Sequence, residues 1–192
     1  MKKIFISILL IGMVLSLAAC SKKKESDKKD ETIESKEVIN IQENSNSVVV
    51  YFSATGTTEK IAEKIANQSG SDIIEIIPKD EYTSADLNYN SDCRANREQN
   101  DDKARPEIKN KIDISEYDTI YLGYPIWWGT NPKIILTLLD TYDFTGKVII
   151  PFCTSGSTDI SGSVSDLRNY NSKLDIKDSK RFSASDSDKV IK

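Results

Sequence analysis

The sequence predicts an α/β fold in which a parallel sheet carries helices on both faces. Four short runs rich in β-branched and aromatic residues recur along the chain, at residues 48–52, 72–77, 119–123 and 148–152. The apolar residues of these runs are continuous rather than alternating, as expected of strands that are buried on both faces. Helical patterns lie between runs, and this alternation of strand and helix is typical of parallel sheets.

Two stretches carry the helical spacing of apolar residues. Residues 57–68 place Ile61 and Ile65 on one side of a helix, and residues 132–139 follow the same pattern. Apolar residues three or four positions apart form a stripe that packs on a sheet. We therefore expect these two segments to be helices that cover the sheet.

The first 20 residues are predicted to be a targeting sequence. Lys2 and Lys3 precede an apolar run that is short for a membrane span. The run ends in Leu-Ala-Ala-Cys, which resembles the lipobox of bacterial lipoproteins, in which the cysteine, here Cys20, is lipid-modified. We expect residues 1–20 to be a lipoprotein signal peptide and the lipid to hold the chain at the extracytoplasmic face of the cell membrane. An ordinary cleavage site with an incidental cysteine is the alternative.

Residues 21–47 are rich in Lys, Glu, Asp, Ser and Asn and hold few large apolar residues. Such a segment buries too little apolar surface to offset the entropy of ordering, so we expect a disordered polar tether. Residues 22–24 could also form a basic patch on anionic lipid, but the acidic residues that follow weaken this reading. The folded domain is then expected at residues 48–192.

Composition and charge exclude several classes of function. The chain of 192 residues has a net charge of −4, and nucleic-acid binding needs a basic face. Histidine is absent, which removes His-based triads and His-ligated metals, and no metal site is expected. Apart from Cys20 the only cysteines are Cys93 and Cys153. A disulfide between them is one option, but two unpaired thiols, one of them buried, is the favoured one.

Hydroxyl side chains cluster around one glycine directly after the first apolar run, in Ser-Ala-Thr-Gly-Thr-Thr at residues 53–58. At this point a strand passes into a helix, whose first N–H groups and positive dipole end favour an anion. The glycine allows close approach of the backbone, and the hydroxyls add donors without charge. The loop predicts a phosphate monoester held without Lys or Arg, with an ordinary strand-to-helix turn as the alternative.

Two further loops follow the third and fourth runs. Residues 122–132 read LGYPIWWGTNP, and an aromatic residue at this position can wall a planar ligand, although one of the two tryptophans is expected to cover the core. Residues 151–163 read PFCTSGSTDISGS, for which a flexible turn is the alternative. Because parallel strands end at one edge of the sheet, we expect all three loops to share one ligand with a phosphate and a flat ring.

These motifs together resemble the flavodoxin-like family, particularly the group with YPIWWG and PFCTSGS. The resemblance implies a flavodoxin-like three-layer sandwich, a five-stranded parallel sheet in the order 2-1-3-4-5, and FMN as the cofactor. It assigns cofactor binding to three sets of residues: Ser53, Thr55, Gly56, Thr57 and Thr58 at the phosphate; Pro125, Ile126, Trp127, Trp128 and Gly129 beside the isoalloxazine; and Thr154, Ser155, Gly156, Ser157 and Thr158 at its other edge.

Two segments depart from a simple pattern. The family normally ends in a full helix packed on the sheet, whereas here a weak strand at 174–176 is followed only by a short helical stretch at 188–191. We expect this last helix to be short or truncated. The long polar segment at 88–105 is predicted to be a functional loop or a solvated helix.

The predicted function is that of an FMN-binding electron-transfer protein anchored to the membrane by lipid. Flavin supplies the redox chemistry, and an acidic surface with a stacked aromatic disfavours the anionic reduced flavin and lowers its potential. Redox partner proteins would deliver and take the electrons, and a backbone flip at Gly129 could expose a carbonyl to the flavin, as in flavodoxins. The alternatives are an NAD(P)H-dependent flavin or quinone reductase, with Arg94 and Arg97 in a second pocket, and a binding module that has lost FMN.

Overall fold

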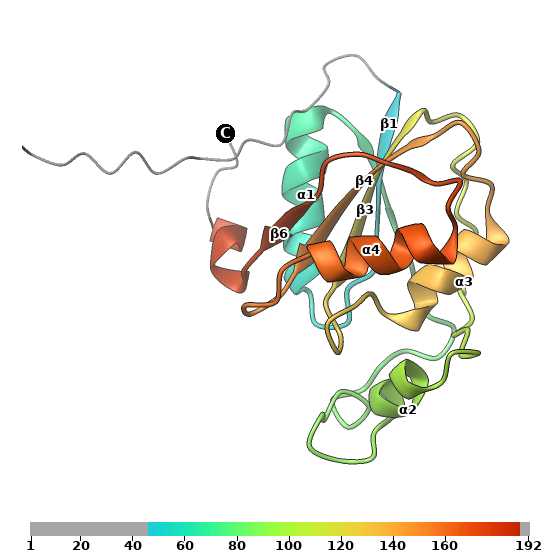
Figure 1. Ribbon diagram of the computed structural model, residues 1–192. Coiled ribbons are helices and arrows are strands. Elements are labelled where there is room, and N and C mark those ends of the chain that lie inside the picture. The colour runs from blue at the N-terminus through green and yellow to red at the C-terminus, as the bar shows by residue number, and fades with distance from the viewer. Residues whose placement is uncertain (1–45, 189–192) are drawn as a thin grey trace, which may run out of the picture. The chain divides into compact units, whose positions relative to one another are not determined.

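The computed structural model describes residues 46–188, which form an α/β domain around one parallel sheet (Figure 1). The predicted signal peptide, Cys20 and nearly all of the predicted tether lie outside these residues. Within residues 46–188 no helix has the length and apolar character needed to cross a membrane.

The strands of the described domain all pair in parallel. They are β1 (Ser47–Tyr51), β2 (Asp72–Glu75), β3 (Thr119–Pro125), β4 (Val148–Thr154), β5 (Asp175–Ile176) and β6 (Lys180–Phe182). The order β2-β1-β3-β4-β5 confirms the predicted order. The fifth position is shared by two short strands, because β5 pairs with the start of β4 and β6 pairs with its end.

Helices cover both faces of this sheet. The helices of residues 46–188 are α1 (Thr57–Ser69), α2 (Arg94–Asn100), α3 (Lys133–Thr141), α4 (Ser161–Tyr170) and the short 3-10 helix η1 (Ala184–Asp188). Helix α1 packs on one face, while α3 and α4 pack on the other. Helix α2 stands apart, below these layers in Figure 1, in the long connection between β2 and β3. The polar segment at 88–105 therefore holds a short helix within a long loop.

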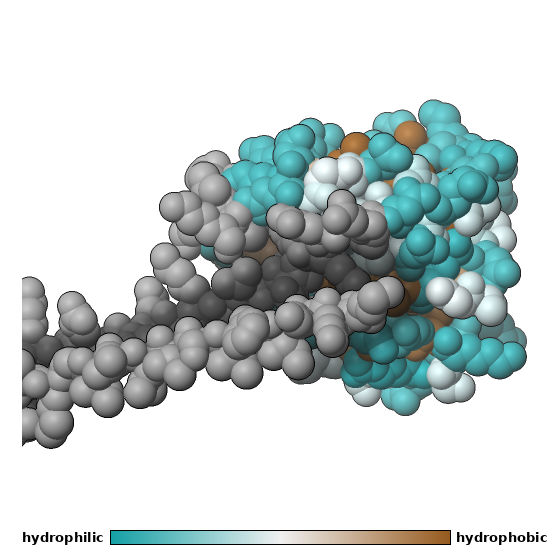
Figure 2. Space-filling model, turned by 90° about the horizontal axis from the view of Figure 1, so that it is seen from above, coloured by the Kyte–Doolittle hydropathy of each residue, from teal (hydrophilic) through white to brown (hydrophobic). Residues whose placement is uncertain are grey.

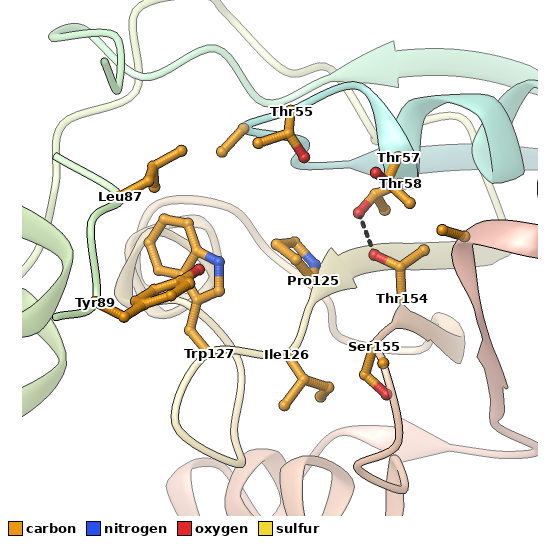
Figure 3. Close-up of a pocket in the computed structure, with 13 residues that line it drawn as sticks. Thr55, Thr57, Thr58, Leu87, Tyr89, Pro125, Ile126, Trp127, Thr154 and Ser155 are labelled. Atoms are coloured by element: carbon orange, nitrogen blue, oxygen red, sulfur yellow. Dashed lines mark hydrogen bonds between the residues drawn. The ribbon is translucent and has the colours of Figure 1, made fainter. Parts of the chain in front are cut away.

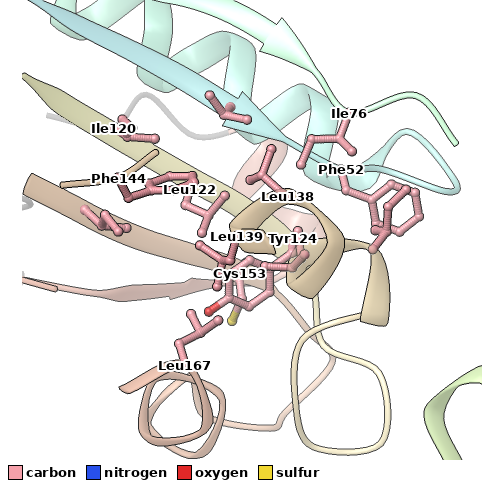
Figure 4. Close-up of a cluster of buried hydrophobic side chains, with 14 of the residues drawn as sticks. Phe52, Ile76, Ile120, Leu122, Tyr124, Leu138, Leu139, Phe144, Cys153 and Leu167 are labelled. Atoms are coloured by element: carbon pink, nitrogen blue, oxygen red, sulfur yellow. The ribbon is translucent and has the colours of Figure 1, made fainter. Parts of the chain in front are cut away.

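Each central strand is buried on both faces, as its continuous apolar sequence predicts. Val48 and Val50 of β1 face the α3 and α4 side, whereas Val49 and Tyr51 face α1. Figure 4 shows the first of these layers, where Leu138 and other leucines of the helices lie over the side chains of β3. The residues that are coloured by hydropathy on the face in Figure 2 are largely hydrophilic. The buried apolar side chains form two clusters, one on each face of the sheet.

The register of β3 and β4 explains the glycine in the middle of β3. Gly123 is paired with Phe152, and a Cβ at Gly123 would lie 2.2 Å from the Phe152 Cζ atom. No side chain fits at that distance. The ring of Phe152 therefore fills the space above Gly123 on the α1 side of the sheet, where it also packs edge-on against Phe182 of β6.

Helix α4 is not predicted from the sequence, which assigns residues up to 163 to the third loop, and that part of the prediction is wrong. The helix carries only Val164 and Leu167 as buried apolar residues, with Ile160 directly before it. This stripe is narrow, and the serines and the glycine of its first turn are typical of a loop. Packing on the sheet stabilises the helix despite its weak pattern.

The two cysteines of the domain are free, as favoured from the sequence, but both of them are buried rather than one. Cys93 caps α2, because its Sγ accepts the Asn96 N–H at 3.4 Å. Cys153 lies in the core between β4 and the α3 and α4 layer. Burial raises the pKa of the Cys153 thiol to about 12, so this group stays protonated and unreactive.

Candidate functional site

A cleft of about 260 Å³ opens where β1, β3 and β4 end (Figure 3). The three predicted loops converge on it, since each follows one of these strands at the carboxyl edge of the sheet. Nine of the predicted site residues line the cleft: Thr55, Thr57, Thr58, Pro125, Ile126, Trp127, Thr154, Ser155 and Gly156.

The other six predicted residues do not line this cleft: Ser53, Gly56, Trp128, Gly129, Ser157 and Thr158. Gly56 is the N-cap of α1, and Trp128 and Gly129 form the tip of the turn after Trp127. Ser157 and Thr158 are exposed, and the carbonyl of Thr158 accepts a hydrogen bond from the Ser155 hydroxyl. These residues thus shape the loops rather than wall the cleft.

One end of the cleft is built by the start of α1. Gly56 has φ +79°, a left-handed backbone that favours glycine, and it offers no side chain to cap the helix. The first N–H groups of α1 have no intrahelical acceptors, and they carry the positive end of the helix dipole. Thr57 and Thr58 place these donors at the cleft.

Hydroxyl groups complete the same end. Thr58 Oγ1 lies 2.8 Å from Thr154 Oγ1, and the bond joins the start of α1 to the end of β4. Ser53 Oγ, in the loop before α1, is buried without a hydrogen-bond partner among the described residues, but Ser53 lies outside the lining of this cleft. No Lys or Arg lines the cleft. The donor set at the cleft suits a phosphate group, because it supplies N–H and O–H groups at a helix start.

The electrostatic field beside the 53–58 loop is negative. Burial together with Glu75, Glu59 and Glu63 raises the pKa of Tyr51 to about 12. Burial, Glu59 and Glu81 raise the pKa of Glu75 as well. An anion at the start of α1 is therefore held by oriented dipoles rather than by opposite charge.

The opposite end of the cleft is aromatic. Trp127 is buried and packs edge-on against Phe52 and Tyr82, at centroid distances of 5.6 and 5.2 Å. Trp128 is 46% exposed and contacts the ring of Tyr89 at 4.8 Å. As expected, one tryptophan of the pair belongs to the core, although Trp127 also walls the cleft. In Figure 3 the rings of Trp127 and Tyr89 lie across from the threonines, with Pro125 between them.

Sequence reasoning missed four lining residues: Ala54, Leu87, Tyr89 and Ala184. Leu87 and Tyr89 come from the long connection before α2. The sequence signal that could have identified them is that they are large apolar and aromatic residues in an otherwise polar segment. Ala184 comes from η1, far along the chain. The cleft therefore has a fourth wall that none of the three motifs predicts.

Arg94 and Arg97, expected in a second pocket, do not line the cleft. Arg94 lies over the Tyr82 ring at 4.1 Å and pairs with Glu98 at 2.6 Å. Arg97 pairs with Asp92 at 3.2 Å. Among residues 46–188 no group of three or more Cys, Asp and Glu side chains is placed to hold a metal ion.

Fold and cleft together define a class of protein: a doubly wound α/β domain with an anion-binding end and an aromatic end in one cleft at its carboxyl edge. The flavodoxin family model matches residues 46–192. The chain belongs to the flavodoxin family, which confirms the resemblance carried by its three motifs.

Solved structures of similar proteins agree with this assignment. A protein of Bacteroides eggerthii DSM 20697 assigned as a flavoprotein shares 40% identity, covers 75% of this chain and 94% of its own, and superposes with a TM-score of 0.71. A flavoprotein of Lactobacillus acidophilus NCFM, solved in complex with FMN, shares 30% identity over 78% of this chain and 100% of its own, with a TM-score of 0.62. No curated protein matches the sequence.

Proposed function

We propose that the protein binds FMN in this cleft and carries electrons between partners at a membrane surface. The observation that carries the proposal is the division of one cleft into a hydroxyl and helix N-terminal end and an aromatic end. FMN has a matching shape, with a phosphate at one end and a planar ring at the other. Its presence in the Lactobacillus acidophilus flavoprotein supports the same ligand here.

The residues divide according to the two ends. Thr57 and Thr58, with the first N–H groups of α1, would hold the phosphate. Trp127 and Tyr89 would border the ring, and Ser155 with Gly156 would lie at its other edge. Bound FMN supplies the electron transfer itself, and the protein supplies position and exclusion of water. Because no cation lines the cleft, nothing in the lining favours a negatively charged ring.

The membrane part of the proposal rests on residues 1–47. Lipid on Cys20 would hold the domain at the extracytoplasmic face, with residues 21–47 as the tether. A single tether of this kind raises the local concentration of membrane partners without any new contact. Replacing Cys20 by Ala should release the protein from the membrane fraction, and retention of the variant would contradict lipid anchoring.

The cofactor is tested by the visible spectrum of the purified protein and by titration with FMN. A yellow protein, or saturable uptake of FMN at one site, is the expected result. A colourless protein that takes up no FMN would favour a module that has lost the cofactor.

The reductase alternative needs a second pocket beside the flavin, and the arginines expected in it, Arg94 and Arg97, do not line the cleft. Adding NADH or NADPH to the FMN-loaded protein without oxygen separates the two functions. An electron carrier should stay oxidised in the absence of a partner, whereas rapid bleaching would identify a reductase.

A further inference from the structure

One side chain of α2, Gln99, links this helix to the turn that carries the two tryptophans. Its Nε2 donates to the carbonyl oxygens of Trp127 and Asn131, each at 3.3 Å. Its Oε1 accepts the N–H of Lys133 at 3.1 Å. The half-buried amide of Gln99 therefore uses both of its donors and its acceptor on a single segment, residues 127–133, which we call the tryptophan turn.

The backbone of the tryptophan turn is one that needs support. Trp127 and Thr130 exchange hydrogen bonds of 2.9 and 3.1 Å across its tip. At the tip Trp128 has φ +50° and Gly129 has φ +82°, and Trp128 is the one non-glycine residue of the described chain with a positive φ. Such a conformation persists only where surrounding contacts determine it. The two bonds from Gln99 lie on either side of the tip.

Gln99 also completes the start of α3. The N-cap of this helix is Pro132, which has no side-chain acceptor for the first N–H groups. The Oε1 of Gln99 supplies that acceptor at Lys133 from another element of the fold. An ion pair also joins Lys133 to the segment that follows α2, because Lys133 Nζ lies 3.5 Å from Asp102 Oδ1.

Helix α2 is itself held against the aromatic end of the cleft. With seven residues it is too short to be stable alone. Arg94 pairs with Glu98 at 2.6 Å and stacks on Tyr82, and the Tyr82 ring packs edge-on against Trp127. Gln99 thus reaches the tryptophan turn from a helix that already touches the same tryptophan.

We propose that Gln99 is a positioning residue for the ring end of the cleft. It positions this end by fixing the backbone of the tryptophan turn. The inference rests on the proposed binding of FMN. Gln99 does not line the cleft, so it acts through Trp127 rather than on the ligand. Its effect falls on the isoalloxazine, because the phosphate end is built by α1 and β4.

The test compares Gln99→Leu, Gln99→Glu and the control Asn100→Ala in the full chain. Asn100 is the exposed next residue of α2. Leu removes all three bonds, whereas Glu keeps the acceptor for Lys133 and loses both donors to the turn. Dissociation constants are measured for FMN and for riboflavin, which has the same ring without the phosphate.

Gln99→Leu and Gln99→Glu should each weaken FMN and riboflavin about tenfold or more and by the same factor, while Asn100→Ala binds as the wild type. The reduction potential of bound FMN should shift in both Gln99 variants and not in the control. Wild-type affinity in Gln99→Glu would overturn the proposal. Glu keeps only the acceptor that caps α3, so the two donor bonds to the tryptophan turn would then have no effect on binding. A loss confined to FMN would overturn it too, because the phosphate end would then be affected.

Amide exchange in the protein without flavin separates this inference from the proposed function. The Thr130 N–H should exchange faster in both Gln99 variants than in Asn100→Ala. If the wild type binds no flavin, the proposed function fails while this measurement still reports whether Gln99 holds the turn. Unchanged exchange at Thr130 in Gln99→Glu would refute that role.

Discussion

The hydroxyls of Thr58 and Thr154 form a buried hydrogen bond of 2.8 Å between residues 96 positions apart in the sequence. One hydroxyl belongs to the first turn of α1 and the other to the last residue of β4. The bond therefore sets the distance between two of the three loops that build the cleft. A change in this contact should alter both stability and ligand binding.

Replacing Thr58 by Val should destabilise the protein by about 1–3 kcal/mol, because the shape is kept while the Thr154 hydroxyl is left buried without its partner. FMN affinity should fall in the same variant. Chemical unfolding and FMN titration measure the two effects. Thr58→Ser retains a hydroxyl and serves as the control. Equal stability and equal FMN affinity of Thr58→Val and Thr58→Ser would show that the hydrogen bond is unimportant.

Gly129 should resist substitution through its backbone alone. A Cβ at this residue would meet nothing within 4 Å, but φ is +82°. Gly129→Val should therefore cost about 1–2 kcal/mol by strain and disturb the tryptophan turn. Gly129→Asn should be milder, since Asn tolerates the left-handed region. The free energy of unfolding and the reduction potential of bound FMN distinguish them, and a harmless Val would mean that the turn rearranges freely.

Gly123 should resist substitution for the opposite reason. Its Cβ would lie 2.2 Å from the Phe152 ring, so Gly123→Ala should destabilise the protein by about 1–3 kcal/mol or more through overpacking. Phe152→Leu alone should also destabilise it, by leaving a cavity. The double variant should lose less than the sum of the two, as expected for residues in contact. Additive losses in urea unfolding would argue against this packing.

Acid should destabilise the protein partly through Asp113. Hydrogen bonds from Ser115, then the charge of Lys111, lower the pKa of Asp113 from 3.8 to about 2. A pKa that is lower in the folded state gives a contribution that is present above the unfolded pKa. It is lost as the pH falls from about 4 to about 2. Unfolding free energies from pH 5 to 2 should fall less steeply in Asp113→Asn than in the wild type.

The parallel sheet was predictable because local sequence carries the signal, whereas the order of its strands was implied only by the resemblance to the flavodoxin-like family. Strands buried on both faces must be largely apolar without alternation, as β1, β3 and β4 are. The helices that cover them must carry apolar stripes, as α1 and α3 do. Helix α4 escaped prediction because only two of its apolar residues are buried. Strand β6 has three residues, too few to show a pattern.

The candidate site was predictable in part for a related reason. Parallel strands end at the same edge, so loops rich in hydroxyls, glycine and tryptophan after three strands had to meet there. One tryptophan of the pair was expected in the core, but the sequence did not indicate which of Trp127 and Trp128 it would be, because the two residues are adjacent. Because the backbone has positive φ at the tip of the turn, the ring of Trp127 lies in the core and the ring of Trp128 lies at the surface.

By itself the sequence determined the class of fold, the three loops and the chemistry of an anion site that is built without charged side chains. Each of these depends on residues that are neighbours along the chain. Only the tertiary structure decided that Tyr89 closes the cleft, that Arg94 and Arg97 stay outside it, and that Gln99 holds the tryptophan turn. Those contacts join segments whose separation in sequence carries no periodic signal. They form only after packing has brought the segments together, which is why sequence patterns do not reveal them.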